Sequence, residues 1–188
     1  MTRLFFVRHA QPEHGWADDR TRPLTPQGMA DTAQVRAFFE QVQPDAAYSS
    51  PYRRSMDTIR SAAEYWGLDI RTDERLRERE GGPDGSGRAM IERRWADRDF
   101  HEAGGESIRM VQDRNVAAVL DILAENQGKT VMIGTHGTAL SSILNHFEPD
   151  FGCAEFFRLK HWMPCIVELD FAGQDYLGRT EHLFITRP

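Results

Sequence analysis

The chain has 188 residues, a length that suits one α/β domain with a full core, so we expect a single domain over residues 1–188. Its formal charge of −6 argues against nucleic acid as a partner, because phosphate backbones are bound mainly by clustered Lys and Arg. No apolar stretch approaches the ~20 residues that cross a bilayer, so we expect no membrane segment.

The first predicted element is a strand over residues 4–7. This continuous apolar run is typical of a strand buried on both faces of a parallel sheet, and Arg8 and His9 follow it directly. Open α/β sheets bind ligands at the carboxyl ends of their strands, so an Arg-His pair there could hold and attack a phosphate. Taken alone, a histidine after an apolar run is more often structural.

A helix is predicted next, with Thr25 as its cap and Pro26 as its first residue, ending near Pro44. Its expected apolar face consists of Met29, Ala30, Ala33, Ala37 and Phe38. A second strand, residues 46–48, leads into Ser49-Ser50-Pro51-Tyr52-Arg53, and Arg53 is expected near the positive N-terminus of the helix at 54–66. That helix stops at Gly67, and a short strand follows at 68–70.

In the second half, Ser107 is the expected cap of a long helix that ends at Asn126-Gln127-Gly128. A strand is predicted at 130–134, with His136 just after its end, and a helix follows at 139–146. Short strands are predicted at 155–159, 165–171 and 183–185. Because strands alternate with helices, we expect an α/β fold with a mostly parallel central sheet.

Two segments carry alternative interpretations. The run Gly81-Gly82-Pro83-Asp84-Gly85-Ser86-Gly87 is predicted to be a mobile loop that could gate a site, or equally a solvent-exposed linker. Arg93 and Arg94, before Trp95, are expected to form a solvated face of an amphipathic helix.

The cysteines and histidines indicate neither a disulfide framework nor a metal site. Cys153 and Cys165 form no Cys-x-x-Cys pair, and the chain begins with a strand where a signal peptide would lie, so we expect a cytoplasmic location. The seven histidines show no HExxH or Cys/His ligand spacing. We therefore expect no catalytic metal and no cofactor.

Four motifs, in chain order, carry a family resemblance: Arg8-His9, Ser49-Ser50-Pro51-Tyr52-Arg53, Gly104-Gly105-Glu106-Ser107 and Thr135-His136-Gly137. Together they resemble the histidine phosphatase superfamily, also called the phosphoglycerate mutase-like family. The segment 22–28 looks like that family's helix-opening segment, and Leu76-Arg77-Glu78 looks like its acidic motif. The resemblance implies a three-layer αβα fold and a phosphate site.

By this resemblance, His9 is the nucleophile and becomes a phosphohistidine, while Arg8, Arg53 and His136 clamp the phosphoryl oxygens. Glu78 is the candidate general acid and base, and Glu80 is its rival, because the two would point the same way in an extended segment. Glu106 is expected in the first turn of a helix, with a structural role.

Departures from the mutases favour a phosphatase. Ala10-Gln11-Pro12 differs from the residues that often follow the histidine in mutases, and the span from Glu78 to Gly104 is short beside their substrate-enclosing insertion. We therefore predict a metal-independent phosphomonoesterase. A phosphoglycerate mutase-type transferase is the alternative, and Arg93-Arg94 is similar to an arginine pair with which mutases hold a substrate carboxylate. A non-catalytic phospho-ligand binding module is a third hypothesis. The expected partner is a phosphorylated small molecule, or a phosphoprotein, and the sequence leaves both the substrate and the oligomeric state open.

Overall fold

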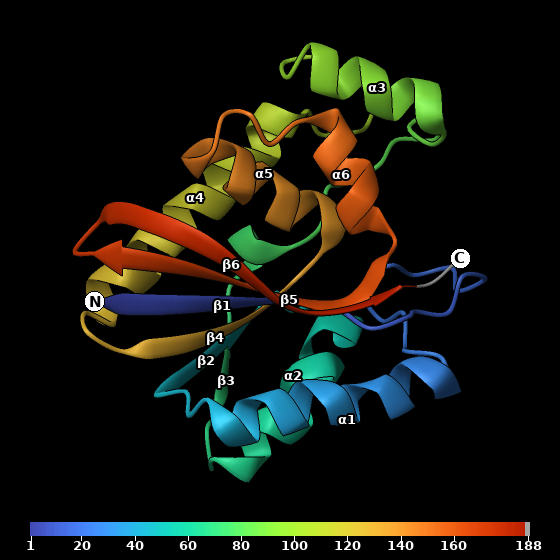
Figure 1. Cartoon of the computed structure of the whole chain (residues 1–188). Helices are drawn as coiled ribbons and strands as arrows, with labels where there is room; N and C mark the ends of the chain where they lie inside the picture. Colours follow the sequence, from blue (N-terminus) through green and yellow to red (C-terminus); the bar gives the residue numbers. More distant parts are fainter. Residues whose placement is uncertain (187–188) are drawn as a thin grey trace.

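The computed structural model describes residues 1–186 and contains a six-stranded sheet in the order β3-β2-β4-β1-β5-β6 (Figure 1). The first four strands in this order run parallel, and β5 and β6 are antiparallel at one edge. The strands are β1 (Thr2–Arg8), β2 (Ala46–Ser49), β3 (Ile70–Thr72), β4 (Thr130–Thr135), β5 (Trp162–Ala172) and β6 (Asp175–Thr186). The predicted α/β class with a mostly parallel sheet is confirmed.

Helices cover both faces of this sheet, as a three-layer αβα fold requires (Figure 1). Helices α1 (Pro26–Gln41) and α2 (Arg53–Tyr65) pack together on one face. The other face carries α4 (Ile108–Glu125), α5 (Gly137–Phe147) and α6 (Cys153–Lys160), and α3 (Arg88–Ala96) contacts α6 on the outer side. A 3-10 turn (Glu74–Leu76) follows β3. None of the helices within residues 1–186 combines the length and the hydropathy that a membrane-spanning helix needs.

Strand β1 is buried on both sides, as its apolar run predicts. Leu4 and Phe6 pack against the α4 and α5 layer, whereas Phe5 and Val7 pack against α1 and α2. All four side chains are fully buried. Each successive side chain points to the opposite face of a strand, so one short run contributes to both cores.

Two predicted helix caps are confirmed. The Thr25 hydroxyl accepts the N–H of Gly28 at 2.9 Å, and the Ser107 hydroxyl accepts the N–H of Met110 at 3.1 Å. The predicted apolar face of α1 is wrong except at Phe38, which packs against the core, because Met29, Ala30, Ala33 and Ala37 are exposed. The buried residues of α1 are Gly28, Asp31, Thr32, Val35 and Phe39. A close backbone contact turns the helix this way: a Cβ on Gly28 would lie 2.3 Å from the carbonyl oxygen of Gln11.

The predicted strand at 155–159 is also wrong, because these residues lie in α6. Phe156 and Leu159, three positions apart, share the buried face of that helix. Glu155 in the first turn and Arg158 in the last turn match the helix dipole. The strand predicted at 68–70 is displaced to β3, and those at 165–171 and 183–185 are parts of the longer β5 and β6.

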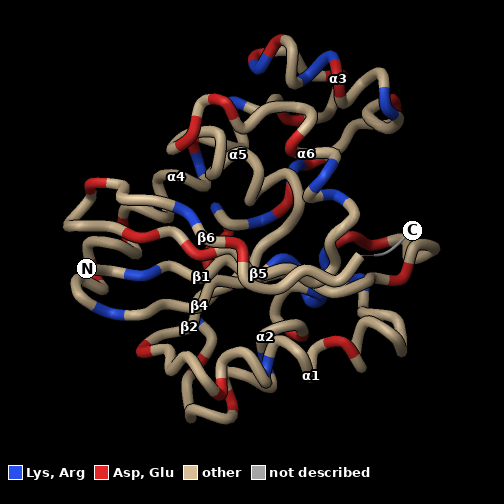
Figure 2. Tube along the Cα trace, in the orientation of Figure 1, with Lys and Arg blue, Asp and Glu red and all other residues tan. Residues whose placement is uncertain are grey.

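Charges of both signs are interleaved along the chain (Figure 2). Most arginines form an ion pair with a carboxylate, often within one helix, as between Arg36 and Glu40 or between Arg88 and Glu92. Such exposed pairs contribute little stability. Arginines that are buried near strand ends therefore stand out as candidates for a different role.

Candidate active site

The carboxyl ends of β1, β2 and β4 meet at one edge of the sheet. Arg8 lies opposite Thr135 in the β1–β4 pairing, and Ser49 lies opposite Gly134 in the β2–β4 pairing. The pairing continues past the strands, since the N–H of His9 donates to the carbonyl of Thr135 at 3.1 Å. The rings of His9 and His136 are consequently neighbours, with centroids 5.3 Å apart.

His9 is buried, with 5% of its surface exposed, and its Nδ1 lies 2.8 Å from the carbonyl oxygen of Ala10. A carbonyl can only accept, so Nδ1 carries the hydrogen and the lone pair is left on Nε2. Burial is the main cause that lowers the pKa of His9 well below its ordinary value, and the nearby cations Arg54, Arg8 and Arg22 lower it further. The imidazole is thus neutral with one nucleophilic nitrogen.

Arg8 is held in place by hydrogen bonds to backbone carbonyls at and just after the end of α6. Its Nη1 donates to the carbonyls of Leu159, Lys160 and Trp162 at 2.7, 2.8 and 2.9 Å. Burial lowers the pKa of this guanidinium below its ordinary value. Gly137 lies against its other side, where an added Cβ would be 3.3 Å from Nε and Nη2. The Nε atom is buried and has no hydrogen-bond partner among residues 1–186.

His136 is fully buried at the start of α5. Its Nε2 lies 2.8 Å from the hydroxyl oxygen of Ser50, which also accepts the N–H of Tyr52 at 3.2 Å. The other ring nitrogen, Nδ1, is buried without a partner in the described part of the chain. Burial, followed by the charge of Arg54, lowers the pKa of His136 well below its ordinary value.

The arginine of the second motif that faces this site is Arg54, and the prediction of Arg53 is corrected. Arg53 is exposed on the outer face of α2, where its Nε donates to Asp57 at 3.3 Å. Arg54 is 3% exposed and is the largest charge effect on the pKa of both His9 and His136. Helical spacing places the two arginines on different faces of α2. Arg53 forms an ion pair with Asp57, four residues later, whereas Arg54 lies on the buried face with Thr58.

A carboxylate that sequence reasoning missed lies on Arg54. Asp19 accepts from Nη1 of Arg54 through both its carbonyl oxygen, at 2.7 Å, and its Oδ1, at 3.1 Å. The same Oδ1 is 3.2 Å from Nη2 of Arg22. One loop carboxylate therefore bridges two arginines whose charges act on His9. The sequence holds no signal for this contact, because Asp19 lies in a loop.

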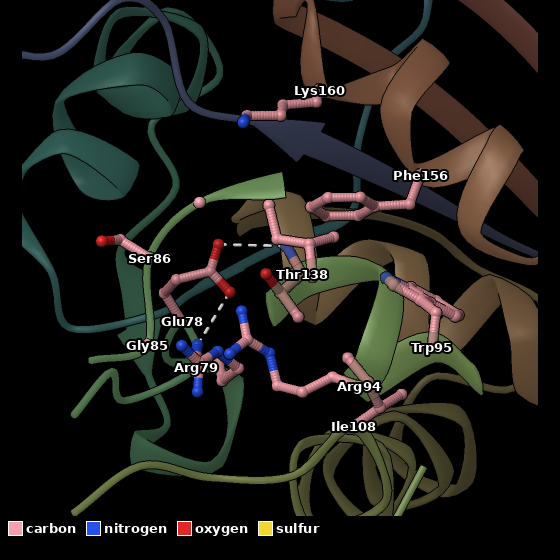
Figure 3. A pocket seen from close by; sticks show the side chains of 12 residues that line it. Glu78, Arg79, Gly85, Ser86, Arg94, Trp95, Ile108, Thr138, Phe156 and Lys160 are labelled. Atoms are coloured by element: carbon pink, nitrogen blue, oxygen red, sulfur yellow. Dashed lines mark hydrogen bonds between the residues drawn. The ribbon is translucent and has the colours of Figure 1, made fainter. Parts of the chain in front are cut away.

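Glu78 lies at the N-terminus of α5, the helix whose cap position is His136. Its Oε2 accepts the N–H of Thr138 at 3.0 Å, and its Oε1 accepts the N–H of Arg79 at 2.8 Å (Figure 3). The same Oε1 also accepts the N–H of Ala139 at 3.1 Å. Glu80, its rival in the sequence, is exposed and lines a surface hollow that also includes Asp19 and Tyr52, and its carboxylate is not among the acceptors at the start of α5. The geometry thus favours Glu78 over Glu80.

Two other glutamates, Glu102 and Glu106, accept hydrogen bonds from arginines around the site. Glu106 precedes the cap of α4, so the prediction that it lies in the first turn is wrong; its carboxylate accepts from Arg77 and Arg114. Burial alone would raise the pKa of Glu106, but these hydrogen bonds lower it to about 2. Glu102 accepts from Arg79 at 2.8 Å and from Arg94 at 3.0 Å. Its pKa is also about 2, since hydrogen bonds outweigh burial.

Glu102 also organises the glycine-rich loop. The N–H of Gly82 donates to it at 3.0 Å, and a Cβ on Gly85 would lie 2.0 Å from Oε1. Arg94, predicted on a solvated face, is instead 4% exposed against Glu102, whereas Arg93 stacks on Phe100 at 3.7 Å. The loop therefore packs as one wall of a cavity next to Glu78 (Figure 3).

A family model, histidine phosphatase superfamily (branch 1), matches residues 4–180. The chain belongs to this superfamily. Phosphoglycerate mutase 1 of Saccharomyces cerevisiae is 25% identical, with 90% of this chain and 88% of the mutase covered. A shorter match, 35% identical over 82 residues, covers 42% of this chain and 40% of a Hydrogenobacter thermophilus protein named "Putative phosphoserine phosphatase 2".

Among solved structures, this superfamily member is similar to mycobacterial glucosyl-3-phosphoglycerate phosphatase, with a TM-score of 0.78 and 21% identity. That comparison covers 98% of this chain and 99% of the phosphatase. At this identity the similarity shows the fold. Among residues 1–186, no group of three or more His, Cys, Asp or Glu is placed to hold a metal ion.

Proposed function

We propose that this histidine phosphatase superfamily member is a metal-independent phosphomonoesterase that works through a phosphohistidine on His9. The observation that carries the proposal is the hydrogen bond from Nδ1 of His9 to the carbonyl of Ala10, at 2.8 Å. It fixes the tautomer and leaves the Nε2 lone pair free to attack phosphorus. Burial beside three arginines keeps the ring neutral by lowering its pKa, which an attacking imidazole requires.

The clamp for the phosphoryl oxygens consists of Arg8, Arg54 and His136. In the phosphoryl-transfer transition state, charge is spread over the equatorial oxygens, and preorganised donors stabilise it. Nε of Arg8 and Nδ1 of His136 are buried nitrogens without partners among residues 1–186, so each can contact an oxygen without first breaking a bond. If the Ser50 hydroxyl donates to Nε2 of His136, then Nδ1 carries the hydrogen that is offered to the phosphate.

Glu78 is the proposed general acid and base. In the first step His9 attacks phosphorus, the phosphorus–oxygen bond to the alcohol breaks, and Glu78 delivers a proton to the leaving oxygen. In the second step the carboxylate takes a proton from water, which attacks the phosphohistidine and releases inorganic phosphate. The backbone N–H groups of Thr138 and Ala139 orient the carboxylate for both steps.

A phosphoglycerate mutase-type transferase is the second candidate function. The buried Arg94 beside the cavity and the resemblance to a yeast mutase favour it. The two reactions differ in the fate of the phosphohistidine, which is hydrolysed by a phosphatase and returned to the substrate by a mutase. Phosphate release from 3-phosphoglycerate should exceed its isomerisation, without a bisphosphorylated primer. Faster isomerisation would establish the mutase.

The nucleophile is tested by brief incubation with radiolabelled phenyl phosphate, followed by an acid quench. The peptide that contains His9 should carry a phosphoryl group that is labile to acid and stable to base. His9→Ala should lose the label and the turnover together, with its fold checked by circular dichroism. A label that persists in His9→Ala would refute the proposal.

A further inference from the structure

Next to Glu78 lies a cavity of about 290 Å³, seen in Figure 3. Residues of α3, α6 and the loop before α3 form most of its walls, and Thr138 at the start of α5 also lines it. Glu78, the proposed proton donor to the leaving oxygen, lines this cavity, so a group that departs beside Glu78 has room there. Small-molecule pockets usually have ~300–1,000 Å³, so the cavity suits a small alcohol.

One side of the cavity is apolar. The residues that form it are Ile91 and Trp95 of α3, Ile108 of α4 and Phe156 of α6. The rings of Trp95 and Phe156 pack against each other, with centroids 5.8 Å apart and planes at 39°. Such a wall binds a flat or aliphatic body better than a polyhydroxylated one, because the indole N–H of Trp95 is its one side-chain partner for sugar hydroxyls.

The charged groups around the cavity include an excess of cations. Arg79 and Arg94 share one carboxylate, that of Glu102, and Lys160 faces Glu78 across the cavity (Figure 3). Three cations therefore meet two carboxylates. The excess of positive charge increases when Glu78 carries the proton that it donates as the general acid. An alcohol with a negative group would balance it.

Lys160 is the cation that is free to bind this group. Within residues 1–186 its amine forms no ion pair, and Nζ lies over the Phe157 ring, 6.0 Å from the centroid. Its own carbonyl accepts from Arg8 at 2.8 Å, which fixes its backbone beside the phosphate clamp. The side chain thus starts at the phosphate site and lines the cavity for the leaving alcohol.

We propose that the substrate is a small phosphomonoester whose alcohol combines an apolar body with a carboxylate, and that Lys160 binds this carboxylate. The inference rests on the proposed phosphatase function. In this proposal Lys160 determines substrate specificity and takes no part in the proton transfers. The apolar body packs on Trp95 and Phe156.

The test uses two esters with the same leaving group: phenyl phosphate with a para carboxyethyl group, and the same ester with a para carbamoylethyl group. They match in size, and their phenols match closely in acidity, so they differ only in the remote charge. The wild type should prefer the carboxylate by about tenfold in kcat/KM, as one additional ion pair allows. Lys160→Met should reduce the ratio to about one, and Lys160→Glu should invert it.

Lys129 supplies the matched control, because it is the only other lysine and precedes β4, at the opposite end of that strand from the site. Lys129→Met should leave the ratio unchanged. Trp95→Ala should raise KM for both phenyl esters more than for methyl phosphate. A wild-type ratio near one, or a preference that survives in Lys160→Met, would overturn the inference while phosphate release continues. Absence of phosphate release from every ester would instead count against the proposed function.

Discussion

The substitution pair Arg53→Ala and Arg54→Ala tests which arginine of the second motif serves the reaction. Arg54 is 3% exposed beside both histidines, whereas 55% of the Arg53 side chain is exposed. A buried donor aimed at developing charge contributes about 2.7–4 kcal/mol, so Arg54→Ala should lower kcat/KM by roughly 10²–10³-fold. Arg53→Ala should change it by less than about twofold, because an exposed i,i+4 pair contributes only ~0.3–0.5 kcal/mol of stability.

The same variant has a second signature in the pH dependence. Arg54 is one of the charges that lower the pKa of His9, after burial itself. Removing it raises that pKa toward its ordinary value, so the imidazole protonates at higher pH and the acid limb of kcat/KM moves to higher pH. Arg54→Lys keeps the positive charge but loses the paired donors of the guanidinium. In this variant the acid limb should therefore lie close to its wild-type position, while kcat/KM stays well below the wild-type value.

Steady-state kinetics from pH 4 to 9 on phenyl phosphate, with chemical denaturation as a check of folding, measures both effects. A hundredfold loss in Arg53→Ala, with Arg54→Ala close to wild type, would refute the assignment. An unchanged acid limb in a folded Arg54→Ala would refute the electrostatic reasoning alone.

Three further predictions use the same site. Glu78→Gln should slow the single-turnover burst with an alkyl phosphate by ~10²-fold yet barely affect a dinitrophenyl ester, and a leaving-group dependence in Glu80→Gln instead would transfer the role. Gly137→Ala should lower kcat/KM by about tenfold without unfolding, since its Cβ would push the Arg8 guanidinium, 3.3 Å away; unchanged kinetics would show that Arg8 can yield. The free energy of unfolding should decrease as the pH is lowered below ~6.5, by up to ~1.4 kcal/mol per pH unit for each buried histidine, because the unfolded chain takes up protons that folded His9 and His136 do not. Urea unfolding at pH 5 and 7 measures this decrease. Equal stability at the two pH values would contradict the lowered pKa values of the two histidines.

Sequence patterns predicted the parts of the fold that depend on local periodicity. The apolar run of β1, the caps Thr25 and Ser107 and the position of His136 after β4 all follow from residues close together in the chain. The strand predicted at 155–159 failed because a short apolar run has no decisive period, and only packing against the rest of the fold makes it helical.

In the candidate site, the motifs located Arg8, His9 and His136 but not the choice between two adjacent arginines. That choice depends on which face of α2 is buried, and the Arg53–Asp57 and Arg54–Thr58 spacings are the signal that could have decided it. The contact of Asp19 with Arg54 had no such signal, because it joins a loop to a helix across 35 residues.

Helix α6 joins the two halves of the site. Its last carbonyls hold Arg8 in place, and its Phe156 and Lys160 line the cavity beside Glu78. A shift of this eight-residue helix would move the phosphate donor and the cavity wall together. Occupancy of one half should then alter affinity in the other, and thermodynamic reciprocity requires that inorganic phosphate and the product alcohol change each other's binding by the same factor.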